Sequence, residues 1–372
     1  MTQLKVDTIT DAAGTAAPDL EDGLTVNGSA LSTVNTAEYY SSGTEPSSPK
    51  NGAIWWDTAN EKTMIYVNDD WYELEEGYTP PPAANSGDRS LRAHGYSYVN
   101  TIDYFDIATT GNASDFGDST SSAYGSAGCS NGTYGVFGGG RTSSGTQDII
   151  DYVTISTTGN ATDFGDLTSG RQMLASASDG TKGCWFGGFN TDQSDIIDYV
   201  TIATTSDASD FGDLTGGCDQ SAGCSDLTYA VCNHSRDISN AVTNTMDYFT
   251  VATTGNATDF GDNTLARRSA SMCADATRGV IWTGWTTTYV NTLDYITIAT
   301  PGNATDFGDS SIKKIYAAAT ANETVGVNAG GWTGGYQNSI QRITIQTTGN
   351  ATDHGDLTEA KYNVSAASGN AS

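Results

Sequence analysis

The chain has 372 residues, and 16 Lys and Arg residues against 44 Asp and Glu residues give it a net charge of −28. A surface of that charge repels phosphate backbones and anionic lipid, so we expect no nucleic-acid partner and no membrane insertion. The 43 Gly and 19 Tyr residues, with few Leu, Lys and Glu, indicate an all-β protein rich in turns. The first residues lack the apolar stretch of a signal peptide, which predicts folding in a reducing cytoplasm.

The front of the chain divides into three segments by composition. Residues 1–36 are poor in aromatic residues and cannot bury a core alone, so we expect them to fold on a partner or on copies of the chain. Residues 37–76 contain strand-like runs around the turn Asn68-Asp69-Asp70 and predict a small β-meander. Residues 77–86, with three consecutive prolines, predict a semi-rigid linker.

The rest of the chain is a repeat. The tetrapeptide Asp-x-Gly-Asp recurs every 47 to 49 residues, and an Asp-Tyr pair recurs with the same period in all copies but the last. The first and last Asp of the six tetrapeptides are Asp115, Asp118, Asp163, Asp166, Asp210, Asp213, Asp259, Asp262, Asp306, Asp309, Asp353 and Asp356. The variable residue is Phe in five copies and His354 in the sixth.

Each copy has the pattern of four short strands, as in the runs 172–178, 182–186, 196–203 and 207–214. This predicts one blade of a β-propeller per copy. The rungs of a β-solenoid are shorter, and period-2 patterning excludes an α-solenoid. The first copy lacks its opening strand, and the last ends soon after one. We therefore predict that residues 87–372 form a closed six-bladed propeller in which both ends of the repeat complete one blade.

The apolar run and double glycine in Val136-Phe137-Gly138-Gly139 and in Trp185-Phe186-Gly187-Gly188, each followed by a Tyr, resemble the kelch family of propellers. The later Trp of that family is absent, and the repeated Phe is a candidate for its place. The resemblance implies the propeller fold that the period also predicts.

The repeated carboxylates have two interpretations, a Ca²⁺ site in each blade or turn chemistry. We favour structural turns, because a residue present in every blade usually serves the architecture. Arg171, Arg267, Lys314 and Lys361 follow five residues after the last Asp and are candidate partners for these carboxylates. The Asn-Ala-Ser/Thr sequences that begin at Asn112, Asn160, Asn256, Asn303 and Asn350 are interpreted as repeat turns rather than glycosylation sites.

Neither a metal site, a cofactor nor a catalytic residue is predicted. Cys129, Cys184, Cys224 and Cys273 occupy small strand positions of the repeat, whereas Cys218 and Cys232 do not follow the pattern. The chain has no Cys-x-x-Cys pair, no nucleophile motif and only three His residues. A glycan-processing enzyme would need acidic residues outside the repeat pattern, placed in the central channel.

The segment between the double glycine and the Asp-Tyr pair differs in every blade. These segments should gather on one face of the ring, where aromatic side chains suit stacking on sugar rings. The predicted receptor-binding residues there are Tyr96, Tyr98, Phe189, Trp285, Tyr289, Trp332 and Tyr336.

Several segments resemble virion proteins of marine cyanophages and related tailed phages: residues 3–10 and 23–28, the run 53–73, and the Ile-Ala-Thr-Thr-Gly-Asn-Ala-Thr-Asp-Phe-Gly-Asp unit. The resemblance implies a non-enzymatic bacteriophage structural protein, assembled in the host cytoplasm into the virion. We expect a homo-oligomeric tail fibre or adhesin that docks on other virion proteins through residues 1–36 and attaches to a host-surface glycan or protein. The alternative is a capsid decoration or head-fibre protein without a receptor, and the third possibility is a glycan-processing enzyme.

Overall fold

The computed structural model describes residues 25–26, 29–30, 39–42, 46, 53–57, 62–67, 70–74 and 87–371. Contacts divide the chain into two units, Met1–Pro80 and Pro81–Ser372. The predicted linker 77–86 and all but four residues of the predicted docking segment 1–36 lie outside the described residues.

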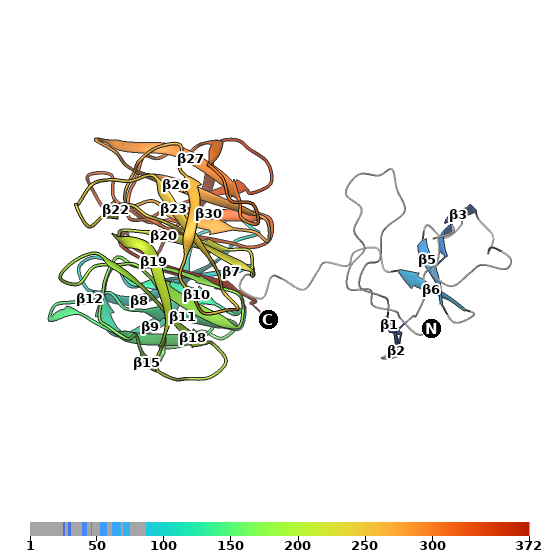
Figure 1. Ribbon diagram of the computed structural model, residues 1–372, viewed down its shortest axis with the longest axis horizontal. Helices are drawn as coiled ribbons and strands as arrows, with labels where there is room; N and C mark the ends of the chain where they lie inside the picture. The colour runs from blue at the N-terminus through green and yellow to red at the C-terminus, as the bar shows by residue number, and fades with distance from the viewer. Residues whose placement is uncertain are drawn as a thin grey trace. The chain divides into compact units, whose positions relative to one another are not determined.

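The first unit contains a four-stranded sheet (Figure 1). Its strands, in sheet order, are β3 (Tyr39–Ser42), β4 (Ile54–Asp57), β5 (Lys62–Val67) and β6 (Asp70–Leu74). β4 to β6 are antiparallel and form the expected meander, and β3 joins β4 by a parallel pairing that the sequence did not indicate. Two short strands, β1 (Thr25–Val26) and β2 (Ser29–Ala30), pair separately.

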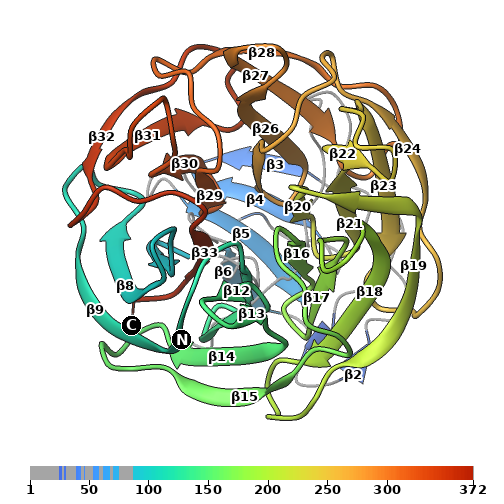
Figure 2. The ribbon, with the colours of Figure 1, turned by 90° about the vertical axis from the view of Figure 1, so that its left-hand side faces the viewer.

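The second unit is a six-bladed β-propeller (Figure 2). Blade 1 comprises β33 (Ser365–Gly369), β7 (Arg89–Ala93), β8 (Val99–Asp106) and β9 (Ser114–Ala123). Blade 2 comprises β10 (Ala127–Ser130), β11 (Tyr134–Gly138), β14 (Ile149–Thr154) and β15 (Thr162–Asp166). Blade 3 comprises β16 (Ala175–Ser178), β17 (Lys182–Phe186), β18 (Ser194–Thr201) and β19 (Ser209–Asp219).

The remaining blades repeat this order. Blade 4 comprises β20 (Ala222–Ser225), β21 (Tyr229–Asn233), β23 (Thr245–Thr250) and β24 (Thr258–Asp262). Blade 5 comprises β25 (Ser271–Ala274), β26 (Arg278–Trp285), β27 (Tyr289–Thr297) and β28 (Thr305–Asp309). Blade 6 comprises β29 (Ala318–Ala321), β30 (Val325–Ala329), β31 (Ser339–Thr344) and β32 (Thr352–Asp356). Short strands in the loops are β12 (Arg141–Thr142), β13 (Gly145–Thr146) and β22 (Arg236–Asp237), the last of which pairs with β19.

Blade 1 closes the ring as predicted. β33 from the end of the repeat pairs antiparallel with β7 from its start, from Ser365 opposite Ala93 to Gly369 opposite Arg89. The first strands of the six blades contact one another in a closed circle, β10-β16-β20-β25-β29-β33. The first strand of every blade is therefore covered by its neighbours, and the edges that remain are those of the short outer strands.

The repeated aromatic residues fill the blade cores. The Phe of the tetrapeptide is at most 3% exposed in five blades, and His354 takes its place in blade 6 at the same exposure. In those five blades the Phe meets the Tyr of the Asp-Tyr pair edge to face, with ring centroids 5.7 to 6.2 Å apart: Tyr104–Phe116, Tyr152–Phe164, Tyr199–Phe211, Tyr248–Phe260 and Tyr295–Phe307. The edge-to-face geometry is favourable for aromatic rings and explains why both residue types repeat.

The tetrapeptide also joins each blade to the next, through a set of contacts that we call the rim belt. The backbone N–H of its last Asp donates to a side-chain oxygen in the following blade at 3.0 to 3.1 Å: Asp118 to Asn160, Asp166 to Asp207, Asp213 to Asn256, Asp262 to Asn303, Asp309 to Asn350 and Asp356 to Asn112. The last of these contacts closes the circle from blade 6 to blade 1. The Asn residues of the Asn-Ala-Ser/Thr sequences are therefore part of the architecture.

The glycine of the tetrapeptide is required by this close approach. At Gly212 the φ angle is +145°, and an added Cβ would lie 2.5 Å from the carbonyl oxygen of Gly255 in the next blade. Only glycine fits such a position without moving a backbone. The tetrapeptide lies within the outer strand of each blade, at a β-bulge, and not in a turn as the sequence suggested.

Candidate functional site

One face of the propeller carries a continuous set of aromatic side chains, which we call the aromatic loop face. Its members are Tyr96, Tyr98, Tyr124, Trp285, Tyr289, Tyr316, Trp332, Tyr336 and Tyr362. They come from two kinds of segment, the connections between the second and third strands of blades and the connections from one blade to the next. Both kinds leave a four-stranded antiparallel blade at the same end, so the fold brings them together.

The part contributed by blades 5 and 6 begins at a tight strand connection. Trp285 and Tyr289 pair across the β26–β27 turn, and their rings meet edge to face with centroids 4.8 Å apart. The Tyr289 hydroxyl accepts a hydrogen bond from Trp332 Nε1 at 3.1 Å. Trp332 in turn contacts Tyr336, with centroids 5.4 Å apart.

Tyr362 joins this part to blade 1. Its ring lies 5.2 Å from Tyr336 and 5.3 Å from Trp332, and it stacks on Tyr96 at 4.7 Å. Tyr96 also contacts Tyr124 at 5.2 Å. Burial and the neighbouring tyrosines raise the pKa of Tyr362, so its hydroxyl stays neutral at physiological pH.

Six of the seven predicted binding residues belong to this set. Phe189 does not: its backbone bridges Gln172 and Gln193 in the loop of blade 3, and in the described part of the chain no ring contact links it to the others. Tyr124, Tyr316 and Tyr362 were not predicted, because they lie on connections between blades rather than in the segments that follow the double glycine. The sequence signal was present, since aromatic residues occupy few of the corresponding positions in other copies.

Three tyrosines give the face its accessible surface. Tyr96 is 41% exposed, Tyr98 39% and Tyr336 43%. The Ser97 hydroxyl lies 3.4 Å from the Tyr336 hydroxyl, so hydrogen-bonding groups accompany the rings. A flat ring beside hydroxyl groups is the combination that stacks on a sugar and bonds its hydroxyls.

The mouth of the central channel opens on the same face. Each blade contributes one residue with φ between 55° and 68° to it: Gly125, Met173, Gln220, Ser269, Tyr316 and Asn363. Backbone hydrogen bonds join neighbours in this circle, from Met173 to Gly125, Gly125 to Asn363, Asn363 to Tyr316 and Tyr316 to Ser269. They hold the mouth in a fixed shape around a cavity of about 70 Å³.

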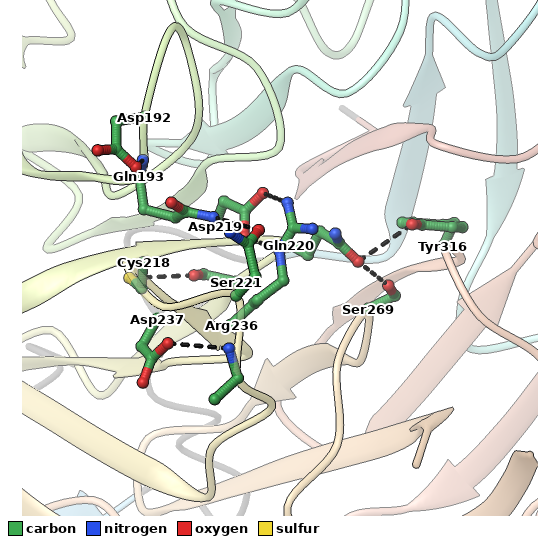
Figure 3. Close-up of polar contacts among 12 residues, drawn as sticks. Asp192, Gln193, Cys218, Asp219, Gln220, Ser221, Arg236, Asp237, Ser269 and Tyr316 are labelled. Carbon is green, nitrogen blue, oxygen red and sulfur yellow. Dashed lines mark hydrogen bonds and ion pairs between the residues drawn. The ribbon is translucent and has the colours of Figure 1, made fainter. Parts of the chain in front are cut away.

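Gln220 adds a polar contact across the mouth. Its side-chain oxygen accepts hydrogen bonds from the Ser269 hydroxyl at 2.6 Å and from the Tyr316 hydroxyl at 3.0 Å (Figure 3). Beside it, Arg236 forms a two-pronged ion pair with Asp219 and so fastens β22 to β19. These contacts tie the loops of blades 3 and 4 to the edge of the aromatic loop face.

Deeper in the channel the lining is uncharged and consists mostly of small residues. Two further cavities, of about 90 and 110 Å³, are lined by Ala, Ser, Gly, Cys and Thr with a few larger apolar residues. None of the described residues that line the three cavities is an acid, a Lys, an Arg or a His.

The cations that follow the tetrapeptide lie under the loop face, where they pair with the Asp of the Asp-Tyr pair. Arg171 binds Asp198 at 2.8 Å, Arg267 binds Asp294 at 2.9 Å and Lys361 binds Asp103 at 2.7 Å, and all six side chains are at most 2% exposed. The expectation that these cations pair with the tetrapeptide carboxylates is therefore wrong. Those carboxylates are exposed or half-buried on the outer strand, and it is their backbone that makes the rim belt.

Blades 2, 4 and 6 depart from this pairing, and in blade 4 Cys218 stands at the cation position while His234 lies 2.8 Å from Asp247. Blade 2 presents Asp151 without a cation, because Ala123 stands at the cation position, and burial raises the pKa of Asp151 although Thr120 donates two hydrogen bonds to it. Blade 6 presents Lys314 opposite Gln341, and burial lowers the pKa of Lys314 to about 7. Its Nζ donates to the carbonyl oxygens of Asn328 and Ser339, at 3.3 and 3.5 Å.

The fold and this face define a class: a six-bladed β-propeller with a connected group of aromatic side chains beside one mouth of its channel. No model of a known protein family matches the chain, and a search of curated proteins found no match. The described part of the chain contains no helix of the length and apolarity needed to cross a membrane.

Proposed function

We propose that the chain is a non-enzymatic binding protein and that its aromatic loop face binds a host-surface glycan. The observation that carries this proposal is the set of ring contacts and one hydrogen bond that connects Trp285 to Tyr98 and includes three tyrosines that are each about two-fifths exposed. Most large apolar side chains of the propeller are buried, so an exposed aromatic group on the variable loops marks an interaction surface.

The surface is fixed in shape before any ligand arrives. Lys361, next to Tyr362, is held by its ion pair with Asp103, and the Tyr362 carbonyl accepts a hydrogen bond from the backbone of Tyr96 at 2.8 Å. A pre-organised site loses little conformational entropy on binding. This suits a weakly binding ligand such as a sugar, whose attachment gains strength from several copies.

The acidic character of the chain limits the classes of ligand that it can bind well. With a net charge of −28, the chain favours a neutral or cationic partner over an anionic polysaccharide. Tyrosine hydroxyls and the Gln220 amide, rather than charged groups, supply the hydrogen bonds around the mouth. We therefore propose a neutral glycan, with a protein receptor as the second choice.

In the wider proposal the chain is a tail fibre or adhesin of a tailed phage. Residues 1–36 dock on other virion proteins, the chain forms a homo-oligomer, and the linker holds the propeller away from the particle. The support is the sequence resemblance, together with the separate unit that precedes the propeller. A capsid decoration protein without a receptor is the alternative that the binding experiment separates from this one.

The test is binding of the full-length chain to a glycan array and to candidate host cells, with the double variant Tyr96→Ala/Tyr336→Ala alongside. Loss of two stacking rings predicts affinity lower by roughly 10- to 100-fold. Ile238→Ala is the matched control, because Ile238 is an exposed apolar residue on a loop outside the aromatic set. Equal binding by the double variant and the parent would contradict the assignment of the aromatic loop face as the binding site. No binding to any cell or glycan would favour a decoration protein.

A further inference from the structure

Three buried side chains meet between blades 3 and 4. They are Cys218 near the end of β19, Cys232 in β21 and His234 just after β21. Both cysteines are fully buried and His234 is 6% exposed, and one donor atom from each lies within 4.8 Å of the other two. In the described part of the chain this is the one group of three or more such side chains placed to hold a metal ion.

The group stands where blades 1, 3 and 5 carry an ion pair between a cation and the Asp of the Asp-Tyr pair. Cys218 follows five residues after Asp213, the position that Arg171, Arg267 and Lys361 occupy in other copies. His234 stands at the position of the glycines Gly139, Gly187 and Gly330. The cysteine at the cation position and the histidine at the glycine position lie at one site. At this site they take the place of the ion pair.

The surroundings suit a metal-binding histidine. The His234 Nε2 atom lies 2.8 Å from Asp247 Oδ2, and Asp247 is the Asp of this blade's Asp-Tyr pair. With Nε2 engaged by the carboxylate, Nδ1 keeps its lone pair for a metal ion. A histidine that donates its second N–H to a carboxylate is the usual arrangement at zinc sites, where the carboxylate fixes the ring and its tautomer.

The first cysteine also has a neighbour that suits a thiolate. The Ser221 hydroxyl donates a hydrogen bond to Cys218 Sγ at 3.2 Å (Figure 3). Two thiolates and one imidazole are the ligand types that select Zn²⁺ among the common divalent ions. Two thiolates also balance the charge of one Zn²⁺ ion. The ion with two thiolates and a neutral imidazole is therefore uncharged, which suits a buried site.

We propose that Cys218, Cys232 and His234 bind one zinc ion, with a water molecule as the fourth ligand. Cys218 belongs to blade 3 and the other two ligands to blade 4, so the metal clips these blades together where Arg171, Arg267 and Lys361 clip other pairs. Both thiols lose their protons to solvent when the ion binds, and no redox step is involved. The sequence alone pointed away from this site, because its two cysteines are 14 residues apart and share no Cys-x-x-Cys spacing.

The test uses the full-length chain, purified reduced and without a metal-affinity tag. We expect close to one zinc per chain by elemental analysis, and a thiolate-to-metal charge-transfer band when Co²⁺ replaces zinc. The double variant Cys218→Ser/Cys232→Ser should lose both, whereas Cys129→Ser/Cys224→Ser, which alters two buried cysteines outside the group, should keep them. Asp247→Asn should weaken metal binding by about 10- to 100-fold.

The cobalt titration of the parent chain needs no variant, so misfolding of a variant does not obscure the result. Absence of the charge-transfer band from the reduced parent chain at excess Co²⁺ overturns the proposal. So does a Cys218–Cys232 disulfide found by mass spectrometry, if reduction of that disulfide restores no metal uptake. Equal loss of metal in the Cys129→Ser/Cys224→Ser variant would place the ion elsewhere.

Discussion

The rim belt and the aromatic loop face are built from the same six repeats in opposite ways. In the rim belt one contact recurs between every pair of neighbouring blades, always from a backbone N–H to an Asn or Asp oxygen at 3.0 to 3.1 Å. On the loop face the blades contribute unequally: blades 5 and 6 each supply a Trp and a Tyr, blade 1 supplies Tyr96 and Tyr98, and the loops of blades 3 and 4 supply none of the rings. Closing a ring needs one contact many times, whereas recognising a ligand needs different groups at different places.

The ion pairs beneath the loop face, like the rim belt, repeat one contact in several blades. Removing the cation of one pair should have the largest effect on stability. Arg267→Met leaves Asp294 buried with only the Thr264 hydroxyl as a side-chain partner. An unpaired buried charge costs about 3–5 kcal/mol of the free energy of unfolding. Denaturant unfolding measures the loss, and Arg268→Met, a change at the half-buried neighbour, should cost less than about 0.5 kcal/mol. Similar losses from both variants would contradict the pairing.

Breaking the rim belt should have the next largest effect. In Gly212→Ala the new Cβ meets the carbonyl oxygen of Gly255, and the backbone angle is strained as well. We expect a loss of about 1–3 kcal/mol. Gly216→Ala is the matched control in the same strand, because nothing lies within 4 Å of the position its Cβ would take. If thermal unfolding shows the two variants to be equally stable, the close approach between blades does not explain the repeated glycine.

The mismatch in blade 6, where Lys314 faces Gln341 instead of an Asp, should make the stability of the chain depend on pH. The pKa of Lys314 falls from 10.5 to about 7 on folding. The unfolded chain therefore binds one more proton between these values, and stability should rise with pH there by at most about 1.4 kcal/mol per unit. Gln341→Asp supplies the carboxylate that other blades have and should flatten this rise. Unfolding measured from pH 6 to 10 checks both chains, and an unchanged slope in the variant would show that Lys314 is not its source.

The sequence predicted the repeated features well. The period of the Asp-x-Gly-Asp motif, the missing first strand and the extra last strand together led to a closed six-bladed ring, and β33 pairs with β7 accordingly. The same reasoning assigned the cations to the wrong carboxylates. Arg267 lies closer along the chain to Asp262 than to Asp294, and only the packing of neighbouring blades decides which carboxylate it meets.

Features that depend on contacts between distant residues were beyond the sequence. Tyr96 and Tyr362 stack although they are far apart along the chain, because the ring closes between them. Cys218 and Cys232 were seen to leave the repeat pattern, but their position beside His234 follows only from the arrangement of β19 and β21. A sequence shows which residues depart from a repeat, whereas only the structure shows that those residues lie together.

The most direct test of the contrast between rim and loop face measures receptor binding and thermal unfolding on the same two variants. Our account predicts that Tyr96→Ala/Tyr336→Ala loses binding while its unfolding midpoint stays close to that of the parent chain. It predicts that Gly212→Ala unfolds at a lower temperature but binds normally where it is folded. A loop-face variant that binds as well as the parent to a ligand that the parent recognises would contradict the account.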